Sequence, residues 1–236
     1  MHKNELGQAI GFPLKDWQAC QRPPKTPIHG RYCRLETLDV ATHVEDLYEA
    51  YGKDQEHSNW TYLPYGPFND FNEFKAWMKQ TCCNDDPHFH TVIDLKTNKA
   101  VGIASLMRIE PEVGVIEVGH IHFSPLMQRT PVSTEALYLL MKRVFDELGY
   151  RRYEWKCDSL NSPSCNAAQR LGFTSEGIFR QLLIYKGRNR DTAWFSIIDK
   201  EWPALKAMFE AWLEPTNFDE SGHQKNTLHF FKTLEC

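Results

Sequence analysis

Residues 123–136, FSPLMQRTPVSTEA, combine a cation with several hydroxyls where a strand-like run meets a helical run. A helix that begins here presents unpaired backbone N–H groups and the positive end of its dipole, which suits a phosphate. Pro131 fits the first helical position. Arg129, Thr130, Ser133 and Thr134 would add charge and hydroxyl donors. The same pattern is also typical of a plain helix that Thr130 caps, with Arg129 in solvent.

A second helix start lies at residues 161–173, NSPSCNAAQRLGF. Asn161 or Ser162 can cap this helix, Pro163 suits its first turn and Gly172 can end it. Ordinary helix-capping and helix-terminating preferences therefore explain every residue except Ser164. Its position near the helix start raises the question of whether its hydroxyl faces a ligand.

Two histidine pairs, in HFH (88–90) and HIH (120–122), each place two imidazoles on one face of a strand. Adjacent faces would give a four-imidazole metal site. No carboxylate or cysteine joins either pair at a recurring ligand spacing, so we expect partly satisfied polar residues and no metal. Glu117 precedes His120 on the same strand and is either a solvent-facing carboxylate or one held near a reacting proton.

The periodicity of the chain predicts a mixed α/β (α+β) fold, with a mostly antiparallel sheet and helices on both faces. Strands are expected at 30–38, 89–95, 101–109, 115–123, 151–157, 177–185 and 191–199. Helices are expected at 40–51, 70–80, from 131 to just before Gly149, 161–172 and 201–213. Short turns between strands indicate hairpins, and the strand at 151–157 can pair in parallel.

Composition excludes several classes of protein. The net charge of −4 argues against a nucleic-acid partner, and no apolar run is long enough to span a membrane. Seven cysteines without a CxxC pair and the lack of an apolar N-terminal stretch favour a reducing, cytoplasmic setting. We expect an extended arm at 1–29, one domain at 30–213 and a loose polar tail at 214–236. A monomer or a homodimer is compatible with this pattern.

From about residue 30 to 203, the order of elements resembles the GNAT superfamily of acetyl-CoA-dependent N-acetyltransferases. The resemblance is strongest to the RimL/RimJ branch, which acetylates ribosomal-protein N-termini. It is carried by IEVGHIHFSPLMQRTPVSTEALYLLMKRVFDELGYRRYEWKCDSLNSPSCNAAQRLGFTSEGIFRQ and YKGRNRDTAWFSIIDKEWP. The pattern N-x2-S-x7-GF-x2-EG is specific in this strand–helix–strand context.

The resemblance implies that strands 115–123 and 151–157 splay apart, so that the pantetheine arm of acetyl-CoA lies between them. The pyrophosphate would then lie over the turn at 128–134. Residues implied in coenzyme binding are Ile121, His122, Phe123, Gln128, Arg129, Thr130, Pro131, Val132, Ser133, Thr134, Asn161 and Ser164. The family turn usually reads Q/R-x-x-G-x-G/A, and both glycines are replaced here. Pro131 also removes one N–H donor.

For catalysis the resemblance implies a primary amine that loses a proton and attacks the acetyl carbonyl. Glu117 or His120 is the expected base, directly or through water. A backbone N–H of strand 115–123 would stabilise the developing oxyanion. Many family members carry an acidic tyrosine four residues before the glycine of GF, but Ala168 stands there. Ser164 or solvent is therefore expected to protonate the leaving thiolate.

The acceptor site is expected beside the segment SNWTYLPYGPFNDF. Trp60, Tyr62, Tyr65 and Phe68 would form an aromatic wall for a cation or a flat group, or else pack in the core. The acceptor is an amine of a protein N-terminus or of a small molecule. Two alternatives stay open: a catalytically silent acyl-CoA-binding protein and a histidine-ligated metalloprotein.

Overall fold

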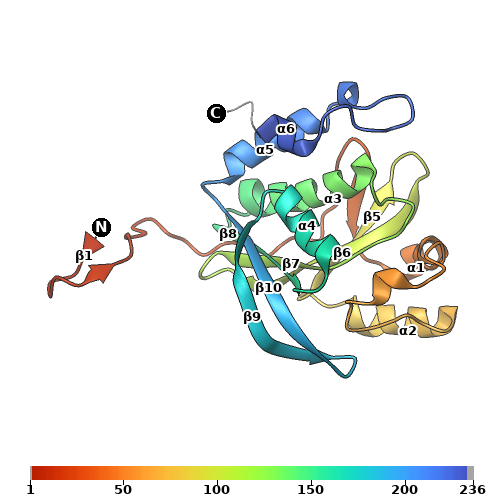
Figure 1. Cartoon of the computed structure of the whole chain (residues 1–236), viewed down its shortest axis with the longest axis horizontal. Helices are drawn as coiled ribbons and strands as arrows, with labels where there is room; N and C mark the ends of the chain where they lie inside the picture. Colours follow the sequence, from red (N-terminus) through yellow and green to blue (C-terminus); the bar gives the residue numbers. More distant parts are fainter. Residues whose placement is uncertain (1, 233–236) are drawn as a thin grey trace.

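The computed structural model describes residues 2–232, which contain an eight-stranded sheet of order β3-β4-β5-β6-β7-β8-β10-β9 (Figure 1). The strands are β3 (Ile28–His29), β4 (Cys33–Thr37), β5 (His88–Asp94), β6 (Lys99–Glu110), β7 (Val115–Phe123), β8 (Arg152–Asp158), β9 (Thr174–Tyr185) and β10 (Arg188–Ile198). Neighbouring strands are antiparallel except β7 and β8, which are parallel. The predicted mixed sheet is confirmed.

Helices cover both faces of this sheet, as predicted. They are α1 (Val40–Tyr51), α2 (Phe71–Thr81), α3 (Pro131–Lys142), α4 (Ser162–Arg170), α5 (Trp202–Trp212) and α6 (Leu228–Lys232), with short turns η1 (Ser58–Trp60), η2 (Arg143–Glu147) and η3 (Pro215–Asn217). One core joins α3, α4 and α5 to β7, β8 and β10. A second core joins α1 and α2 to β5 and β6 on the opposite face. Within residues 2–232, no helix is long and apolar enough to cross a membrane.

The helices α1 and α2 form where short acidic side chains precede an apolar stripe. Asp39 accepts a hydrogen bond from the backbone N–H of Thr42, and Asp70 accepts from the N–H groups of Asn72 and Glu73. These bonds satisfy donors that a helix start leaves unpaired. Both helices thereby begin at fixed positions and direct their apolar faces onto β5 and β6.

The strand β7 bends at His120. Ser105 pairs with Gly119 and Ile103 pairs with His122, so two residues of β7 oppose one residue of β6. His120 adopts a left-handed backbone with φ of 49°. An extra residue of this kind is a β-bulge, which kinks a strand and redirects its side chains.

The strands β7 and β8 separate just before this bend. Their pairing runs from Val115 with Arg152 to Val118 with Trp155. Beyond these residues β7 pairs with β6 alone and β8 with β10 alone, within the described chain. The two strands therefore part between 119–123 and 156–158, at the place that the resemblance implied; this gap in the pairing is called the opening below.

The N-terminal arm is partly integrated into the fold. Its first residues, with β1 (His2–Lys3) and β2 (Ala9–Ile10), project from the body (Figure 1). Trp17, however, donates from its indole nitrogen to the carbonyl of Glu112 at 2.8 Å. Its ring occupies the space that a side chain at Gly114 would need. Ile28 is buried and pairs with β4, so the expectation that 1–29 stays outside the core is corrected at its end.

The C-terminal segment is also folded, up to the last described residue. Leu228 of α6 is 1% exposed and packs in the core with α5. The buried side chain of Asn217 donates to the carbonyls of Trp212 and Asn226 and accepts from the N–H of Asn226. These bonds correct the expectation of a loose tail for residues 214–232; residues 233–236 lie outside the described part.

Candidate active site

In the described part of the chain, residues 2–232, no side chain caps the start of α3. The hydroxyl of Thr130 donates to the carbonyl of Met127 at 2.8 Å, and that of Ser133 donates to the carbonyl of Thr130 at 2.9 Å. The N–H groups of Val132 and Ser133 are therefore left without a side-chain acceptor. The plain capping alternative for Thr130 is not what the structure contains.

Arg129 stands immediately before this helix with a left-handed backbone, φ 61°. Among residues 2–232 its guanidinium makes no hydrogen bond or ion pair. Arg170, at the end of α4, donates to the hydroxyl of Thr134 at 2.8 Å. Two cations therefore accompany the free amides, and this combination is what an anion requires.

The start of α4 is arranged differently. Asn161 caps it by accepting from the N–H of Ser164 at 3.2 Å. The hydroxyl oxygen of Ser164 accepts from the indole nitrogen of Trp155 at 3.0 Å. Trp155 is the last residue of β8 that pairs with β7, so Ser164 lies beside the opening. Burial raises the pKa of the nearby Cys157 thiol, and a hydrogen bond with the Ser164 hydroxyl lowers it, so this hydroxyl also faces the Cys157 sulfur.

Glu117 is buried on the face of the sheet opposite α3. Its carboxylate lies 2.7 Å from Arg108 and 2.8 Å from the ammonium of Lys156. Lys156 in turn pairs with Glu154 and lies 3.8 Å from the centroid of the Trp194 ring. Within this network the carboxylate of Glu117 is therefore engaged by two cationic side chains.

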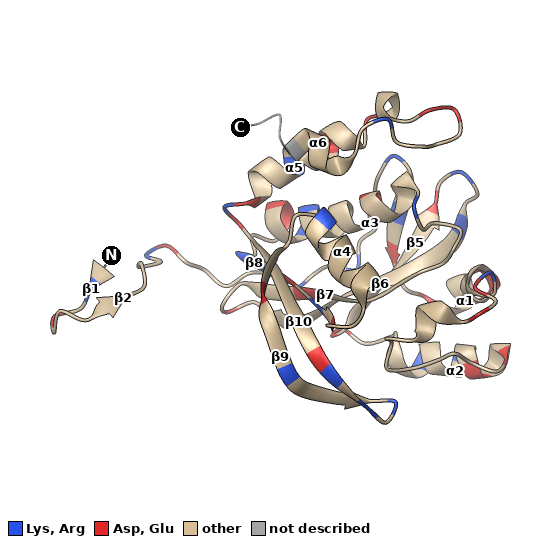
Figure 2. Cartoon of the chain, viewed as in Figure 1, with Lys and Arg blue, Asp and Glu red and all other residues tan. Residues whose placement is uncertain are grey.

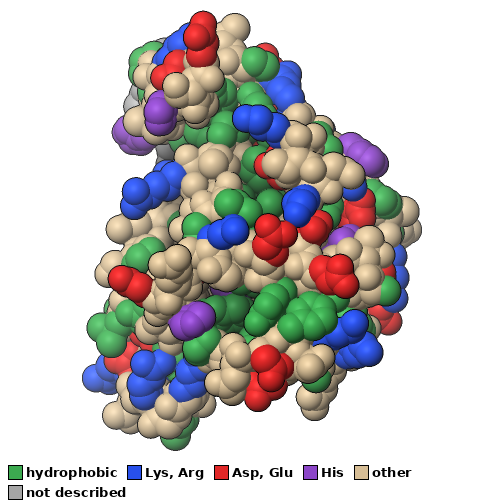
Figure 3. Space-filling model, turned by 90° about the vertical axis from the view of Figure 1, so that its right-hand side faces the viewer, with side chains coloured by type: hydrophobic (Ala, Val, Ile, Leu, Met, Phe, Trp, Pro, Cys, Tyr) green, Lys and Arg blue, Asp and Glu red, His purple; other side chains and the backbone are tan. Residues whose placement is uncertain are grey.

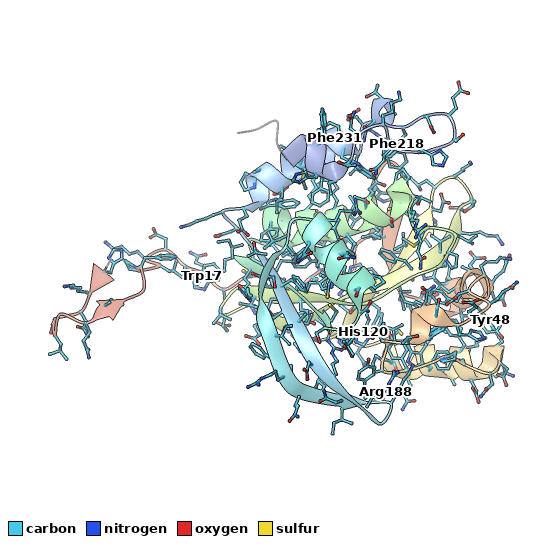
Figure 4. All side chains as sticks on the ribbon, in the orientation of Figure 1. Trp17, Tyr48, His120, Arg188, Phe218 and Phe231 are labelled. Atoms are coloured by element: carbon cyan, nitrogen blue, oxygen red, sulfur yellow. The ribbon has the colours of Figure 1, made fainter. Side chains whose placement is uncertain are left out.

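His120 lies at the bend of β7, between the β9–β10 hairpin and the side of α1 and α2 (Figure 4). Its Nδ1 is 3.0 Å from the hydroxyl of Tyr65, whose ring stacks on the imidazole. Phe89 packs against the same ring at 5.0 Å. Burial lowers the pKa of His120 to about 4, so the imidazole is neutral at pH 7. Its Nε2 has no protein partner among residues 2–232.

His122 faces away from the opening. Its ring stacks on Tyr51 at 3.9 Å, and its carbonyl accepts from the Tyr51 hydroxyl at 2.9 Å. Burial lowers the pKa of His122 to about 3. Ile121 and Phe123 pack against the core of α3, and Gln128 donates to the carbonyl of Phe123. A direct role in coenzyme binding therefore suits the backbone of this stretch better than the His122 side chain.

The aromatic residues of the α1–α2 loop mostly pack together. Trp60 is 4% exposed and contacts Tyr65, Phe68 and His122. The core-packing alternative therefore describes Trp60, Tyr65 and Phe68. Tyr62 differs, because its hydroxyl donates to the carbonyl of Leu160 near the start of α4.

The four histidines do not meet. His88 and His90 stack on each other at 4.5 Å, and burial lowers the pKa of both, that of His90 to about 3. Phe89 points the other way, toward His120, so the two pairs lie on opposite faces. Within residues 2–232 no group of three or more histidine, cysteine or acidic side chains is placed to hold a metal ion.

The tip of the β9–β10 hairpin closes one side of the opening, which the sequence did not reveal. Lys186 donates to the carbonyl of Trp60 and Arg188 to that of Thr61, both at 2.8 Å. Basic side chains gather at this tip (Figure 2). A hollow with hydrophobic side chains opens in the lower half of the face in Figure 3. The residues KGRNRD give no local signal of these contacts, because the partner of Lys186 lies 126 residues away in the chain.

Comparisons with known proteins agree with this geometry. Residues 34–174 match the family model of the acetyltransferase (GNAT) domain. A GCN5-related N-acetyltransferase structure from Brucella melitensis is 48% identical, with a TM-score of 0.91 over 93% of this chain and all of that one. A probable GNAT-family acetyltransferase structure from Chromobacterium violaceum is 40% identical, with a TM-score of 0.77 over 83% and 98% of the two chains.

A curated relative lies further away. The uncharacterized N-acetyltransferase p20 of Bacillus licheniformis is 25% identical over 174 residues, which are 72% of this chain and 95% of that protein. The family model spans more than half of the chain and includes both β7 and the start of α3. The RimL/RimJ branch is not distinguished by these matches. The chain is an acyltransferase that belongs to the GNAT acetyltransferase family.

Proposed function

We propose that this protein uses acetyl-CoA to acetylate a primary amine, and that its acceptor is a protein N-terminus or a small molecule. The observation that carries the proposal is the uncapped start of α3, with an unpaired Arg129, next to the opening between β7 and β8. A family that transfers acetyl groups from acetyl-CoA needs an anion site and a slot at these two places.

The residues present fit the coenzyme. The N–H groups of Val132 and Ser133, together with Arg129, would hold the pyrophosphate despite the missing glycines. Within residues 2–232 no strand pairs with 119–123 on the β8 side, so backbone groups there that accept no side-chain bond are available to the amides of a pantetheine arm. The side-chain amide nitrogen of Asn161 remains free to donate, because the cap uses its oxygen.

The opening separates two groups of functional side chains. Ser164 belongs to the face of α3 and α4, whereas His120 belongs to the face of α1 and α2. Coenzyme on the first face and amine on the second would meet in the opening. The acetyl thioester supplies the group that is transferred, and the chain supplies proton transfer and orientation.

His120 is the base in this proposal. A neutral imidazole with a free Nε2 accepts the amine proton directly or through one water. The hydroxyl of Ser164 donates a hydrogen bond to the departing thiolate, which takes its proton from solvent, and the indole of Trp155 orients the hydroxyl oxygen. A backbone N–H at the bend of β7 stabilises negative charge on the acetyl oxygen.

The acceptor would approach between the hairpin tip and the α1–α2 loop. Lys186, Arg188 and Tyr62 bind neighbouring segments there and narrow the entrance. A narrow entrance favours a slender group such as a chain end or an alkylamine. The resemblance to the RimL/RimJ branch supports a protein N-terminus as the first acceptor to test.

The experiment has two stages. Thermal melting with acetyl-CoA tests binding, since ligand at about 100 times Kd adds about 2.7 kcal/mol to stability. Release of free thiol with panels of peptide N-termini and small amines then tests transfer. Arg129→Gln should weaken binding, whereas Arg180→Gln on the exposed surface of β9 serves as the matched control.

No shift at millimolar acetyl-CoA would overturn the proposal. A clear shift without thiol release for any amine would instead favour the silent acyl-CoA-binding alternative. The buried Ala168, where many relatives carry a tyrosine, is the observation that keeps this second candidate in the test.

A further inference from the structure

A pocket of about 460 Å³ lies beside the start of α3, outside the opening itself. Its walls come from residues 129–134, from Arg170 of α4 and from the C-terminal residues Trp212, Phe218 and 222–224. This volume is in the range of ordinary small-molecule sites. The C-terminal part of the wall lies beyond residue 174, where the match to the acetyltransferase domain ends.

The C-terminal wall is a built structure. The indole nitrogen of Trp212 donates to the side chain of Gln224 at 2.9 Å. Lys225 donates from its backbone to Asn217 at 2.6 Å and from its ammonium to Thr216 at 2.9 Å. Buried Asn217 joins both ends of the loop, as described above. The polar loop 219–226 is thus held in one place over the start of α3.

The pocket carries positive charge and aromatic surface together. Within residues 2–232 Arg129 is unpaired, Arg170 donates one side-chain hydrogen bond, to Thr134, and His223 adds an imidazole. No carboxylate lines the pocket within the described residues, but the exposed imidazole of His223 lies 3.5 Å from the carboxylate of Asp219, which also accepts from the backbone N–H groups of Ser221 and His223. Phosphates suit such a cluster.

Phe218 and Trp212 meet edge to face at 5.0 Å, and half-buried Phe218 shows part of its ring toward the pocket. A flat heteroaromatic base can stack on such a ring. Arg170 lies 6.0 Å from the Trp212 ring, so cation and aromatic surface are adjacent. Phosphate and a planar base together describe a nucleotide.

The geometry points to a subsite in which the C-terminal segment holds the 3′-phosphoadenosine end of coenzyme A. This inference rests on the proposed function, because the pyrophosphate at the start of α3 would deliver the nucleoside into the adjoining pocket. Arg170 and His223 would contact the nucleotide phosphates, and Phe218 would stack on the adenine. The C-terminal segment would then select the whole coenzyme over its pantetheine part.

Calorimetric titration tests this with three ligands: coenzyme A, 3′-dephospho-coenzyme A and 4′-phosphopantetheine. The wild-type protein should bind coenzyme A about tenfold or more tightly than the dephospho form, as the loss of a charge-assisted hydrogen bond predicts. In the double variant Arg170→Gln, His223→Gln this ratio should fall toward one. Arg180→Gln, His229→Gln carries the same replacements on exposed residues outside the pocket and should keep the wild-type ratio.

Three outcomes overturn the inference. The inference requires the wild-type protein to discriminate by the 3′-phosphate, so equal affinities for coenzyme A and its dephospho form contradict the inference while leaving the proposed function intact. An unchanged ratio in the double variant, with an unchanged melting temperature, also contradicts it. No binding of coenzyme A at all removes the proposed function and this inference together.

A competition experiment distinguishes a site for coenzyme A from a site for free nucleotides. Adenosine 3′,5′-bisphosphate should displace coenzyme A, because it is the same chemical end without the arm. ATP that binds the pocket more tightly than the bisphosphate would assign the site to a free nucleotide and would overturn the inference.

Discussion

The two strands that separate in the sheet lead into helices with opposite starts. The start of α4, after β8, is capped by Asn161, and the start of α3, after β7, has no side-chain cap although Thr130 stands in position. A missing cap of this type costs about 1 kcal/mol. In the proposed function the uncapped amides of α3 bind the coenzyme, whereas the cap of α4 stabilises the helix that carries Ser164.

The largest expected effect is a loss of turnover when His120 is replaced. His120→Asn tolerates the left-handed backbone and keeps a polar contact with Tyr65. Loss of the base should lower kcat by about 100-fold or more, with the Kd of acetyl-CoA unchanged. Stopped thiol-release assays and calorimetry measure the two quantities. An equal loss of kcat and of affinity for acetyl-CoA would mean that His120 contributes to coenzyme binding.

The pH profile sharpens the same point. His120 must be neutral to act, and its pKa of about 4 means that it stays neutral above about pH 5. The rate should therefore show no histidine limb between pH 5 and 7, and should fall only as pH approaches 4. A limb near pH 6.5 that disappears in His120→Asn would contradict the buried, neutral imidazole.

Adding charge at the two helix starts compares them directly. Ser133→Asp places a carboxylate in the first turn of α3, where it favours the helix dipole but repels a pyrophosphate. Acetyl-CoA binding should weaken about 10- to 100-fold without loss of melting temperature. Ser162→Asp makes the matched change on α4 and should leave affinity unchanged. An equal loss of acetyl-CoA affinity in both variants would contradict a coenzyme site at the start of α3 alone.

Ser164→Ala tests the α4 side of the chemistry. The free thiol has a pKa of about 8.5, so the thiolate departs without much help and kcat should fall only several-fold. The Kd of acetyl-CoA should not change. A large fall in kcat together with a weaker Kd for acetyl-CoA would show that Ser164 holds the coenzyme instead of assisting the leaving group.

The smallest effect concerns stability. Asn161→Ala removes a cap and should lower the free energy of unfolding by about 1 kcal/mol, whereas Thr130→Ala should lower it by less, because its hydroxyl caps nothing. Urea unfolding measures both. The reverse order would mean that Thr130 caps α3 in solution.

The sequence predicted the sheet, the helices and the place where β7 and β8 part, because periodicity and the family motifs are local signals. It left the start of α3 undecided, since whether Thr130 bonds an amide or Met127 depends on the backbone of Arg129. It also missed the folded C-terminus. The segment looks polar, and only tertiary bonds of Asn217 and the burial of Leu228 order it.

The contact between Trp17 and Gly114 makes the N-terminal arm part of a distant turn. Because the indole fills the space above the glycine, any side chain at 114 would evict it, and φ of 65° there already disfavours one. Backbone amides that follow Trp17 in the arm should consequently exchange hydrogen with solvent as slowly as those of the β6–β7 turn. Amides that precede Trp17 should exchange as fast as those of an unfolded peptide. Gly114 thus determines the residue, Trp17, at which the N-terminal arm becomes part of the folded domain.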